Sequence, residues 1–520
     1  MKDSVTIAPY AGIMKRLPAH KVAGQKKQYL IQAMNYISTD AKIKTMPGND
    51  RYNTTQVGGP ISWAKRIYYR IGTDLFRSQF ATAGGFMYKG EDSLKVFNQV
   101  KINNGNDPLI ASNTMPQDTA IEVSGNTVTY LVDGTNFFKF VPNLAGEWEK
   151  LGTLVDVDGN DIEPIDVIAY QDRLFILVKN RNVILFSKNG EVENFSNSTD
   201  AGLIQIPSGN GGYPQRLIIY NGYPYVIHED YFAPVTGSSA ATYAVRPGDI
   251  VYGYGTRAPE SVTEVRDFFG FLNSEDNEYY LSGGTQSTTS KIPLSYDIQL
   301  SKLINPVKAS LTAAIHDPNT GCLRISYPPT GEPLNNAEAL YSLDEEKWAG
   351  ETYGRKIARY CLWNGAGDSN QLLTTRTDIG CLMYEGVLTT IDGAAIHYRL
   401  VTGDYADDYI HDVQFTEFYI DAKPFGTYTK MPLAYYMDGR NSTYAQADVT
   451  LQGEVINLGL IEIGAQDMML ERIMPILNRS KGRMIQFISD ETVSNTSREI
   501  YSITCVFNVQ NRRKTKWTTG

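Results

Sequence analysis

The feature that most constrains the fold is a long series of short apolar segments with almost no helical pattern between them. In the stretch DRLFILVKNRNVILFSKNG, residues 174–178 and 183–186 are apolar on both faces and flank a polar turn. Asn221-Gly222 and Asp133-Gly134 are dipeptides typical of two-residue hairpin turns. Strands buried on both faces usually belong to parallel sheets covered by helices. Because helices are scarce here, we expect antiparallel sheets that pack radially against one another, as in a β-propeller.

A second pattern is the recurrence of strand ends that carry an aromatic residue followed by a polar residue or glycine. Their intervals are about 43 to 61 residues, which suits a four-stranded propeller blade. They lie near Tyr88, Phe140, Phe186, Tyr231, Tyr280, Tyr341 and Tyr384. The phrase AGGFMYKG at 83–90 returns as IGCLMYEG at 379–386, which predicts equivalent positions in the first and last blades. The sequence therefore predicts a propeller of six or seven blades over residues 51–390, with a large irregular sandwich as the alternative.

The regions on either side of this span differ from it. Residues 1–50 read as an arm with one apolar run, QYLIQAMNYI, before the turn at Pro47 and Gly48. Residues 391–520 are β-rich again and end in the basic tail NRRKTKWTTG. No Pro/Gly/Ser linker separates this region from the propeller. We expect a mainly β protein in which the C-terminal region and the N-terminal arm form an additional β-rich platform domain.

Charge is distributed unevenly along the chain. The formal net charge is −9, with +5 in residues 1–30 and +4 in residues 511–520, which leaves −18 for the residues between them. Such ends are either solvated tails or docking segments for acidic partners. The docking candidates are Lys15, Arg16, Lys26, Lys27, Arg512, Arg513, Lys514 and Lys516.

Residue patterns of known chemistry are missing from the sequence. The five histidines are scattered, and no nucleophile elbow, phosphate loop or dinucleotide fingerprint is present. In DVDGNDIEPID, residues 156–166 imitate the start of a calcium loop, but Asp161 stands where the loop needs glycine. The four cysteines form no CxxC pair and are expected to be reduced residues of the core. We therefore expect no enzyme activity, no cofactor and no metal.

Two acidic clusters are candidates for the paired carboxylates of a propeller glycosidase. NSEDNE contains Glu275, Asp276 and Glu278, and DYADDY contains Asp404, Asp407 and Asp408. Both look like exposed loops without a supporting arginine cluster. YSLDEEKW at 341–348 resembles a sialidase Asp-box, but Glu346 replaces its glycine.

The order of features resembles the tail hub or nozzle proteins of short-tailed bacteriophages, including the group called packaged-DNA stabilisation proteins. The resemblance rests on Asn35 within QAMNYI, on the Pro47-Gly48 turn, and on Met87 to Gly90. It continues through Asp166 to Phe175, through Tyr341, Asp344 and Trp348, and through Gly482 and Arg483 before the strand MIQFIS. Each motif is short, although together they span most of the chain.

The resemblance implies a structural protein of the virion tail, assembled in the host cytoplasm. Six copies would form a tube below the portal and adaptor that retains packaged DNA and conducts it during ejection. Implied partners are the head-to-tail adaptor, a tail fibre, tailspike or needle protein, and genomic double-stranded DNA without sequence-specific binding. No apolar run is long enough for membrane insertion, and the N-terminus lacks the apolar stretch of a secretion signal.

A tube that lets DNA slide should not be lined with basic residues, because contacts with phosphates accumulate into strong binding. We therefore predict that some of the acidic loops face the lumen, and the candidates are Glu275, Asp276, Glu278, Asp404, Asp407 and Asp408. The alternatives are a propeller hydrolase acting on glycans, which needs convergent carboxylates and arginines at one mouth of the ring, and a glycan-binding adhesin with exposed aromatic platforms.

Overall fold

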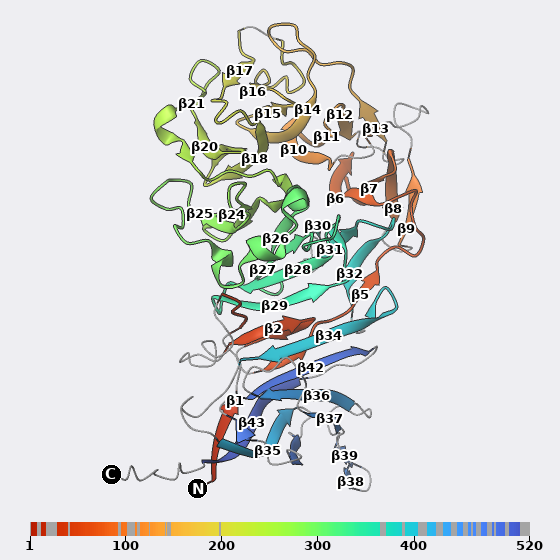
Figure 1. Cartoon of the computed structure of the whole chain (residues 1–520). Helices are drawn as coiled ribbons and strands as arrows, with labels where there is room; N and C mark the ends of the chain where they lie inside the picture. Colours follow the sequence, from red (N-terminus) through yellow and green to blue (C-terminus); the bar gives the residue numbers. More distant parts are fainter. Residues whose placement is uncertain are drawn as a thin grey trace, which may run out of the picture. The chain divides into compact units, whose positions relative to one another are not determined.

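The structure is a computed structural model of a chain built mainly of strands (Figure 1). The chain forms two compact units. The propeller unit comprises residues 51–338 and 355–385, and the platform unit comprises residues 1–50, 339–354 and 386–520. No helix in the described part of the chain is long and apolar enough to cross a membrane. The structure describes residues 2–7, 12–16, 29–39, 42–91, 95–100, 110–111, 115–123, 125–140, 142, 147–196, 199–363, 371–386, 390–403, 413–422, 430–437, 445–450, 456–458, 461–463, 470–475, 481–482, 485–493 and 499–509.

The first four blades of the propeller unit are antiparallel sheets whose strands follow chain order. Blade one contains β6 (Ile61–Ile71), β7 (Asp74–Ala83), β8 (Phe86–Glu91) and β9 (Val96–Gln99). Blade two contains β10 (Gln117–Val123), β11 (Asn126–Val132), β12 (Phe137–Phe140) and β13 (Trp148–Lys150). Blade three contains β14 (Pro164–Tyr170), β15 (Arg173–Val178), β16 (Val183–Phe186) and β17 (Gly202–Gln205). Blade four contains β18 (Pro214–Tyr220), β19 (Tyr223–His228), β20 (Tyr231–Thr236), β21 (Ala244–Val245) and β22 (Val251–Tyr252).

The remaining blades are less regular. The short helix η2 (Pro259–Ser261) leads into blade five, which contains β23 (Thr263–Val265), β24 (Phe268–Leu272) and β25 (Tyr279–Ser282). The short helices η3 (Leu294–Asp297), α2 (Leu300–Leu303) and η4 (Pro306–Leu311) then connect to blade six, which begins with the hairpin of β26 (Ala313–Asp317) and β27 (Cys322–Tyr327). Blade seven contains β30 (Ile357–Trp363), β31 (Gln371–Arg376) and β32 (Leu382–Glu385).

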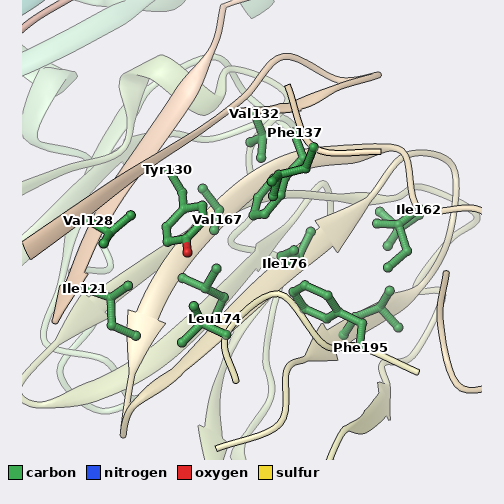
Figure 2. Close-up of a cluster of buried hydrophobic side chains, with 14 of the residues drawn as sticks. Ile121, Val128, Tyr130, Val132, Phe137, Ile162, Val167, Leu174, Ile176 and Phe195 are labelled. Carbon is green, nitrogen blue, oxygen red and sulfur yellow. The ribbon is translucent and has the colours of Figure 1, made fainter. Parts of the chain in front are cut away.

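The innermost strands of these seven blades form a ring. β10 lies against β14, β14 against β18, β23 against β26, and β26 against β30, and the ring closes where β30 lies against β6. Buried apolar clusters lie between consecutive blades, such as the cluster between blades two and three in Figure 2, which includes Tyr130, Phe137, Val167 and Ile176. Another cluster joins the first blade to the last through Ile61, Phe97, Trp363 and Leu373. The predicted propeller is confirmed, with seven blades, and its strands are apolar on both faces because a neighbouring blade covers each side.

The repeated phrase lies where the ring closes. It forms β8 and β32, the third strands of the first and last blades. Residues 53–59 run close to both Gly84 and Gly380: a Cβ on Gly84 would lie 2.7 Å from the Gly58 carbonyl oxygen, and one on Gly380 would lie 2.4 Å from the Val57 carbonyl oxygen. Asn53 Oδ1 also accepts a hydrogen bond from Leu382 N (2.7 Å). The glycines of the phrase therefore permit close backbone contact at the seam of the ring.

The platform unit combines strands from both ends of the chain. One sheet has the order β3 (Tyr36–Ser38), β4 (Ile43–Thr45), β43 (Glu499–Val509), β35 (Val413–Ala422) and β40 (Leu470–Pro475), with β1 (Lys2–Ile7) also paired to β43 and β41 (Lys481–Gly482) to β35. In the same unit, β34 (Ala394–Thr402) pairs with β2 (Leu30–Met34), β33 (Thr390–Ile391) and β42 (Ile485–Val493). β36 (Lys430–Met437) pairs with β37 (Ala445–Thr450) and β42, and β38 (Ile456–Leu458) pairs with β39 (Ile461–Ile463). The predicted platform of N-terminal arm and C-terminal region is confirmed.

The platform also takes residues 339–354 from inside the predicted propeller span of 51–390. This segment carries β29 (Lys347–Tyr353), which pairs in parallel with β2. The chain crosses between the units four times: within β5 (Asn49–Arg51), within β28 (Ala337–Ser342), after residue 354 and after residue 385.

Asn35, from the apolar run QAMNYI, joins β2 to β3 with a positive φ of 58°. Its Nδ2 donates to the His397 carbonyl oxygen (2.7 Å), and its Oδ1 accepts from Tyr353 N (3.0 Å). Asparagine tolerates this left-handed conformation better than most residues, so it can turn the chain here and bridge two further strands of the platform.

Candidate functional site at the propeller axis

Four innermost strands share a β-bulge at their second residue. The bulges lie between Ile61 and Trp63, Pro164 and Asp166, Pro214 and Arg216, and Ile357 and Arg359. A bulge inserts an unpaired residue and redirects the side chain that follows it. In three of these blades the residue after the bulge is charged.

These charged residues belong to a group of six that we call the axial cluster. Its members are Lys65, Asp118, Asp166, Arg216, Glu260 and Arg359. Five of them lie on the innermost strands of blades one, two, three, four and seven, and Glu260 lies in η2, which leads into blade five. Arg359 of blade seven bonds to Gln117 Oε1 of blade two (3.0 Å) and to Glu260 Oε2 before blade five (3.0 Å). Contacts between blades that are not neighbours in the ring place the cluster at its centre.

Asp118 is fully engaged within the cluster. Its Oδ1 accepts a hydrogen bond from Trp63 Nε1 (2.7 Å), and its Oδ2 bonds to Lys65 Nζ. Burial would raise the pKa of Asp118, but Lys65 and the hydrogen bond from Trp63 outweigh burial and hold the pKa below its ordinary value. Asp118 is therefore a stable anion.

Asp166 lies in a different environment. Its Oδ1 accepts from Val167 N (2.9 Å) and its Oδ2 from Leu217 N (2.6 Å), while Arg216 Nε lies 3.7 Å from Oδ2. Burial dominates here and raises the pKa of Asp166, although Arg216 and both backbone groups favour the charged form. Burial opposes the charge of Arg216, yet Asp166, Glu260 and Asp118 raise the pKa of this guanidinium.

Glu260 completes the network. Its Oε1 accepts from Gln117 Nε2 and lies 3.9 Å from Arg216 Nη1, and its Oε2 pairs with Arg359. The cluster thus balances three carboxylates against three cations, and every carboxylate oxygen already has a donor from the protein.

The sequence reasoning missed the axial cluster, although a signal for it was present. PIDVIAYQDRLFILV at 164–178 and PQRLIIYNGYPYVIH at 214–228 share a proline, a charged residue two positions later and a common apolar pattern. Proline is tolerated at the first position of a strand, and the charged residue follows the bulge. Aligning these two segments would have indicated Asp166 and Arg216 as equivalent inner positions.

The acidic cluster NSEDNE forms the turn between β24 and β25. Glu275 is exposed, whereas Asp276 accepts hydrogen bonds from Glu278 N (3.0 Å) and from the Tyr280 hydroxyl (2.6 Å). Glu278 is buried, and its Oε1 accepts from Ser301 N (3.1 Å) while its Oε2 accepts from Ser295 Oγ. The prediction that Glu278 faces a lumen is wrong, because this carboxylate anchors the segment of η3 and α2. Asp404, Asp407 and Asp408 lie outside the described residues.

The basic docking candidates have mixed outcomes. Lys15 pairs with the buried Glu351 of its own platform unit, so it is not a free docking cation. Arg16 is exposed but has a contact of its own. Lys26, Lys27, Arg512, Arg513, Lys514 and Lys516 lie outside the described residues.

The other sequence candidates have structural roles. Asp156 Oδ1 accepts from Asp158 N (3.0 Å) and Asn160 N (2.8 Å), and Arg181 Nη1 lies 2.9 Å from its Oδ2, so an arginine faces the carboxylate that a calcium ion would need. All four cysteines are free and buried. Glu346 of the Asp-box-like segment has a positive φ of 49°, which is the conformation that the glycine of that motif would adopt more easily.

Comparisons with known proteins show similarity to solved structures alone. No family model and no curated protein matches the chain. An exo-β-1,3-galactanase from Phanerochaete chrysosporium is 9% identical with a TM-score of 0.27, over 89% of this chain and 99% of that one. YCF48 from Cyanidioschyzon merolae is 8% identical with a TM-score of 0.36, over 65% of this chain and 98% of that one.

Proposed function

We propose that this chain is a structural protein of a short bacteriophage tail, in which six copies form a tube that retains packaged DNA and conducts it during ejection. The proposal builds on the resemblance of the sequence to tail hub and nozzle proteins. It is supported by the architecture of a seven-bladed propeller unit joined to a platform unit in which both ends of the chain are paired. This architecture suits a rigid building block.

The observation that carries the proposal is that every carboxylate oxygen of the axial cluster is already engaged by the protein. A catalytic site needs a carboxylate that can reach a substrate and change its protonation state. Here each oxygen of Asp118, Asp166 and Glu260 already accepts from a neighbouring side chain or backbone group. The network is suited to fixing the blades relative to one another, which is a structural role.

The same network bears on the path that DNA would take in this proposal. Because the six side chains of the axial cluster meet at the axis of the propeller, the DNA path in this proposal runs between copies. Six copies carry a formal charge of −54. Within about one Debye length, ~8 Å at physiological salt, such walls repel DNA instead of binding it.

The proposal is tested by the state of the purified protein. We expect mass photometry to show a hexamer, either alone or with the adaptor, and negative-stain images to show six-fold rings with a central hole. A monomer under both conditions, with no ring in the images, would refute the proposal.

A glycoside hydrolase is the second candidate. It is favoured by one observation, namely that the pKa of Asp118 is lowered while that of Asp166 is raised. Glycosidases use pairs of carboxylates whose environments separate their pKa values in this way. Release of nitrophenol from a panel of aryl glycosides, abolished by Asp166→Asn, would establish this function, and a rate equal to that of buffer would exclude it for those substrates.

A further inference from the structure

Two hollows of the propeller unit share a wall. The larger, of about 720 Å³, lies between the β17–β18 connection, the β19–β20 turn and the β24–β25 turn. The smaller, of about 350 Å³, lies between the β24–β25 turn and η4. Arg257, Asn273 and Ser274 line both, so the two hollows are adjacent, and we call them together the blade 4–5 groove.

The larger half of the groove is acidic. It is lined by Glu229, Asp230 and Glu275 against the single cation Arg257. Glu229 pairs with Arg257 Nε (3.0 Å), and Asp230 accepts from Asn210 N (2.7 Å). Glu275 is exposed and has no ion-pair partner among the residues that the structure describes. The net negative charge favours a cationic ligand.

An aromatic ring stands beside these carboxylates. Tyr252 is 56% exposed, although its ring lies only 5.6 Å from that of buried Tyr231. Tyr231 in turn stacks on His228 at 4.4 Å with an interplanar angle of 8°. A ring fixed from behind and open to solvent in front can accept a lysine or arginine side chain on its face.

The shared wall offers a hydrogen-bond donor. Asn273 is only 4% exposed, and its Oδ1 accepts from Gly255 N (3.3 Å). Its Nδ2 has no hydrogen-bond partner in the described part of the chain, and the residue lines both hollows. An amide donor without a partner at the wall of a hollow can donate a hydrogen bond to a ligand or to water. A backbone carbonyl of an extended segment crossing from one hollow to the other would do so.

The smaller half of the groove includes several apolar residues in its lining. Its lining includes Ala258, Leu272, Pro306 and Val307, and Val307 is 82% exposed. An exposed valine beside a hollow is suited to contact with an apolar side chain of a partner.

We propose that the blade 4–5 groove binds an extended protein segment that carries lysine or arginine residues followed by an apolar residue. The basic side chain lies between Glu275 and the ring of Tyr252, the segment's backbone bonds to Asn273, and the apolar side chain contacts Val307. Charge complementarity favours this occupant over a glycan, because a neutral sugar gains nothing from the net charge of the acidic half. The inference does not depend on a hexamer and applies equally to a monomer.

The test uses a synthetic peptide of stated sequence. NRRKTKWTTG has the required chemistry, four basic residues followed by a tryptophan, and matches residues 511–520 of the chain. We expect the labelled peptide to bind the full chain in fluorescence anisotropy, with an affinity that falls as salt rises. The matched peptide NQQQTQWTTG, without the positive charges, should not bind, and NRRKTKSTTG should bind more weakly.

Variants of the protein locate the binding site. Glu275→Lys should weaken binding about tenfold and Tyr252→Ala about fivefold, as expected for loss of a charge contact and of a cation–π contact. Glu264→Lys changes an exposed glutamate of the same blade outside the groove and should leave the affinity unchanged. No binding at roughly 1 mM peptide, the scale of the weakest specific complexes, overturns the proposal. So does equal binding of the uncharged peptide, an unchanged affinity in Glu275→Lys, or binding of a neutral oligosaccharide that Tyr252→Ala abolishes.

Discussion

Replacing Gly380 with alanine tests how the ring closes. The new Cβ would lie 2.4 Å from the Val57 carbonyl oxygen, 2.7 Å from the Gly59 carbonyl oxygen and 2.9 Å from Val57 N. All three atoms belong to backbone, so no side chain can rotate away to make room. Val57 N also donates to the Gly380 carbonyl oxygen (3.0 Å), which fixes the two segments against each other.

The expected cost follows from this geometry. Overpacking a well-packed site typically costs about 1–3 kcal/mol, and we expect Gly380→Ala to reach the upper end, because the seam must open along residues 53–59. The change in unfolding free energy can be measured by urea denaturation followed by tryptophan fluorescence. Trp63, Trp148 and Trp363 are buried within the propeller unit and report its unfolding.

Gly152→Ala is the matched control. Gly152 lies in the same unit, and a Cβ there would meet nothing within 4 Å. Such a change is expected to be neutral or slightly stabilising. If Gly380→Ala unfolds at the same urea concentration as Gly152→Ala, the close passage of residues 53–59 beside the last blade is not what closes the ring.

Three further predictions concern other parts of the chain. Asn35→Ala should cost about 3 kcal/mol from two lost hydrogen bonds and a strained left-handed residue, while Asn35→Gly keeps the conformation and should cost clearly less in the same denaturation experiment. At Glu385, burial raises the pKa, but Arg324 and Arg355 outweigh burial and hold the pKa at about 2. The pairing of Glu385 with these arginines therefore stabilises the folded chain fully above the unfolded pKa of about 4.5, and this stabilisation is lost as pH falls toward about 2. Glu385→Gln should therefore lower stability at neutral pH by an amount on the order of 2 kcal/mol and flatten the acid side of the stability profile, and an unaltered profile would contradict the pairing. Burial raises the pKa of Cys361 to about 12, so Ellman's reagent at pH 8 should detect no thiol in the native chain and four after denaturation, and rapid native labelling would contradict this burial.

The fold was predictable because its signals are local and repeated. Segments such as residues 174–178 are apolar on both faces, and only packing between sheets explains them in a chain with few helices. The repeated phrase at 83–90 and 379–386 also indicated which blades meet. Both signals arise because each sheet buries both of its faces against neighbouring blades, so the same residue pattern recurs from blade to blade.

The axial cluster was not predictable in the same way, because its members lie far apart in the sequence. Asp118, Asp166, Arg216 and Arg359 each look like a single charge at a strand edge. Only ring closure brings them together, and only bulges direct them inward. Glu278 shows the converse, since its acidic neighbours suggested an exposed loop, whereas two serines of the η3 and α2 segment bind it in the interior.

The axis and the seam together explain how a ring of sheets keeps one arrangement. Buried ion pairs add little net stability, because the loss of hydration offsets their attraction, but a pair that loses one partner is strongly unfavourable. At the axis, Glu260 and Arg359 are satisfied only when blade seven and the segment before blade five are both in place. At the seam, Gly84 and Gly380 admit residues 53–59 only when the first and last blades meet. A ring with one blade displaced would therefore leave charges unpaired at its centre and a gap at its edge. A propeller held in this way is a rigid body. We therefore expect its partners to bind at the surface turns of the propeller, such as those that form the blade 4–5 groove.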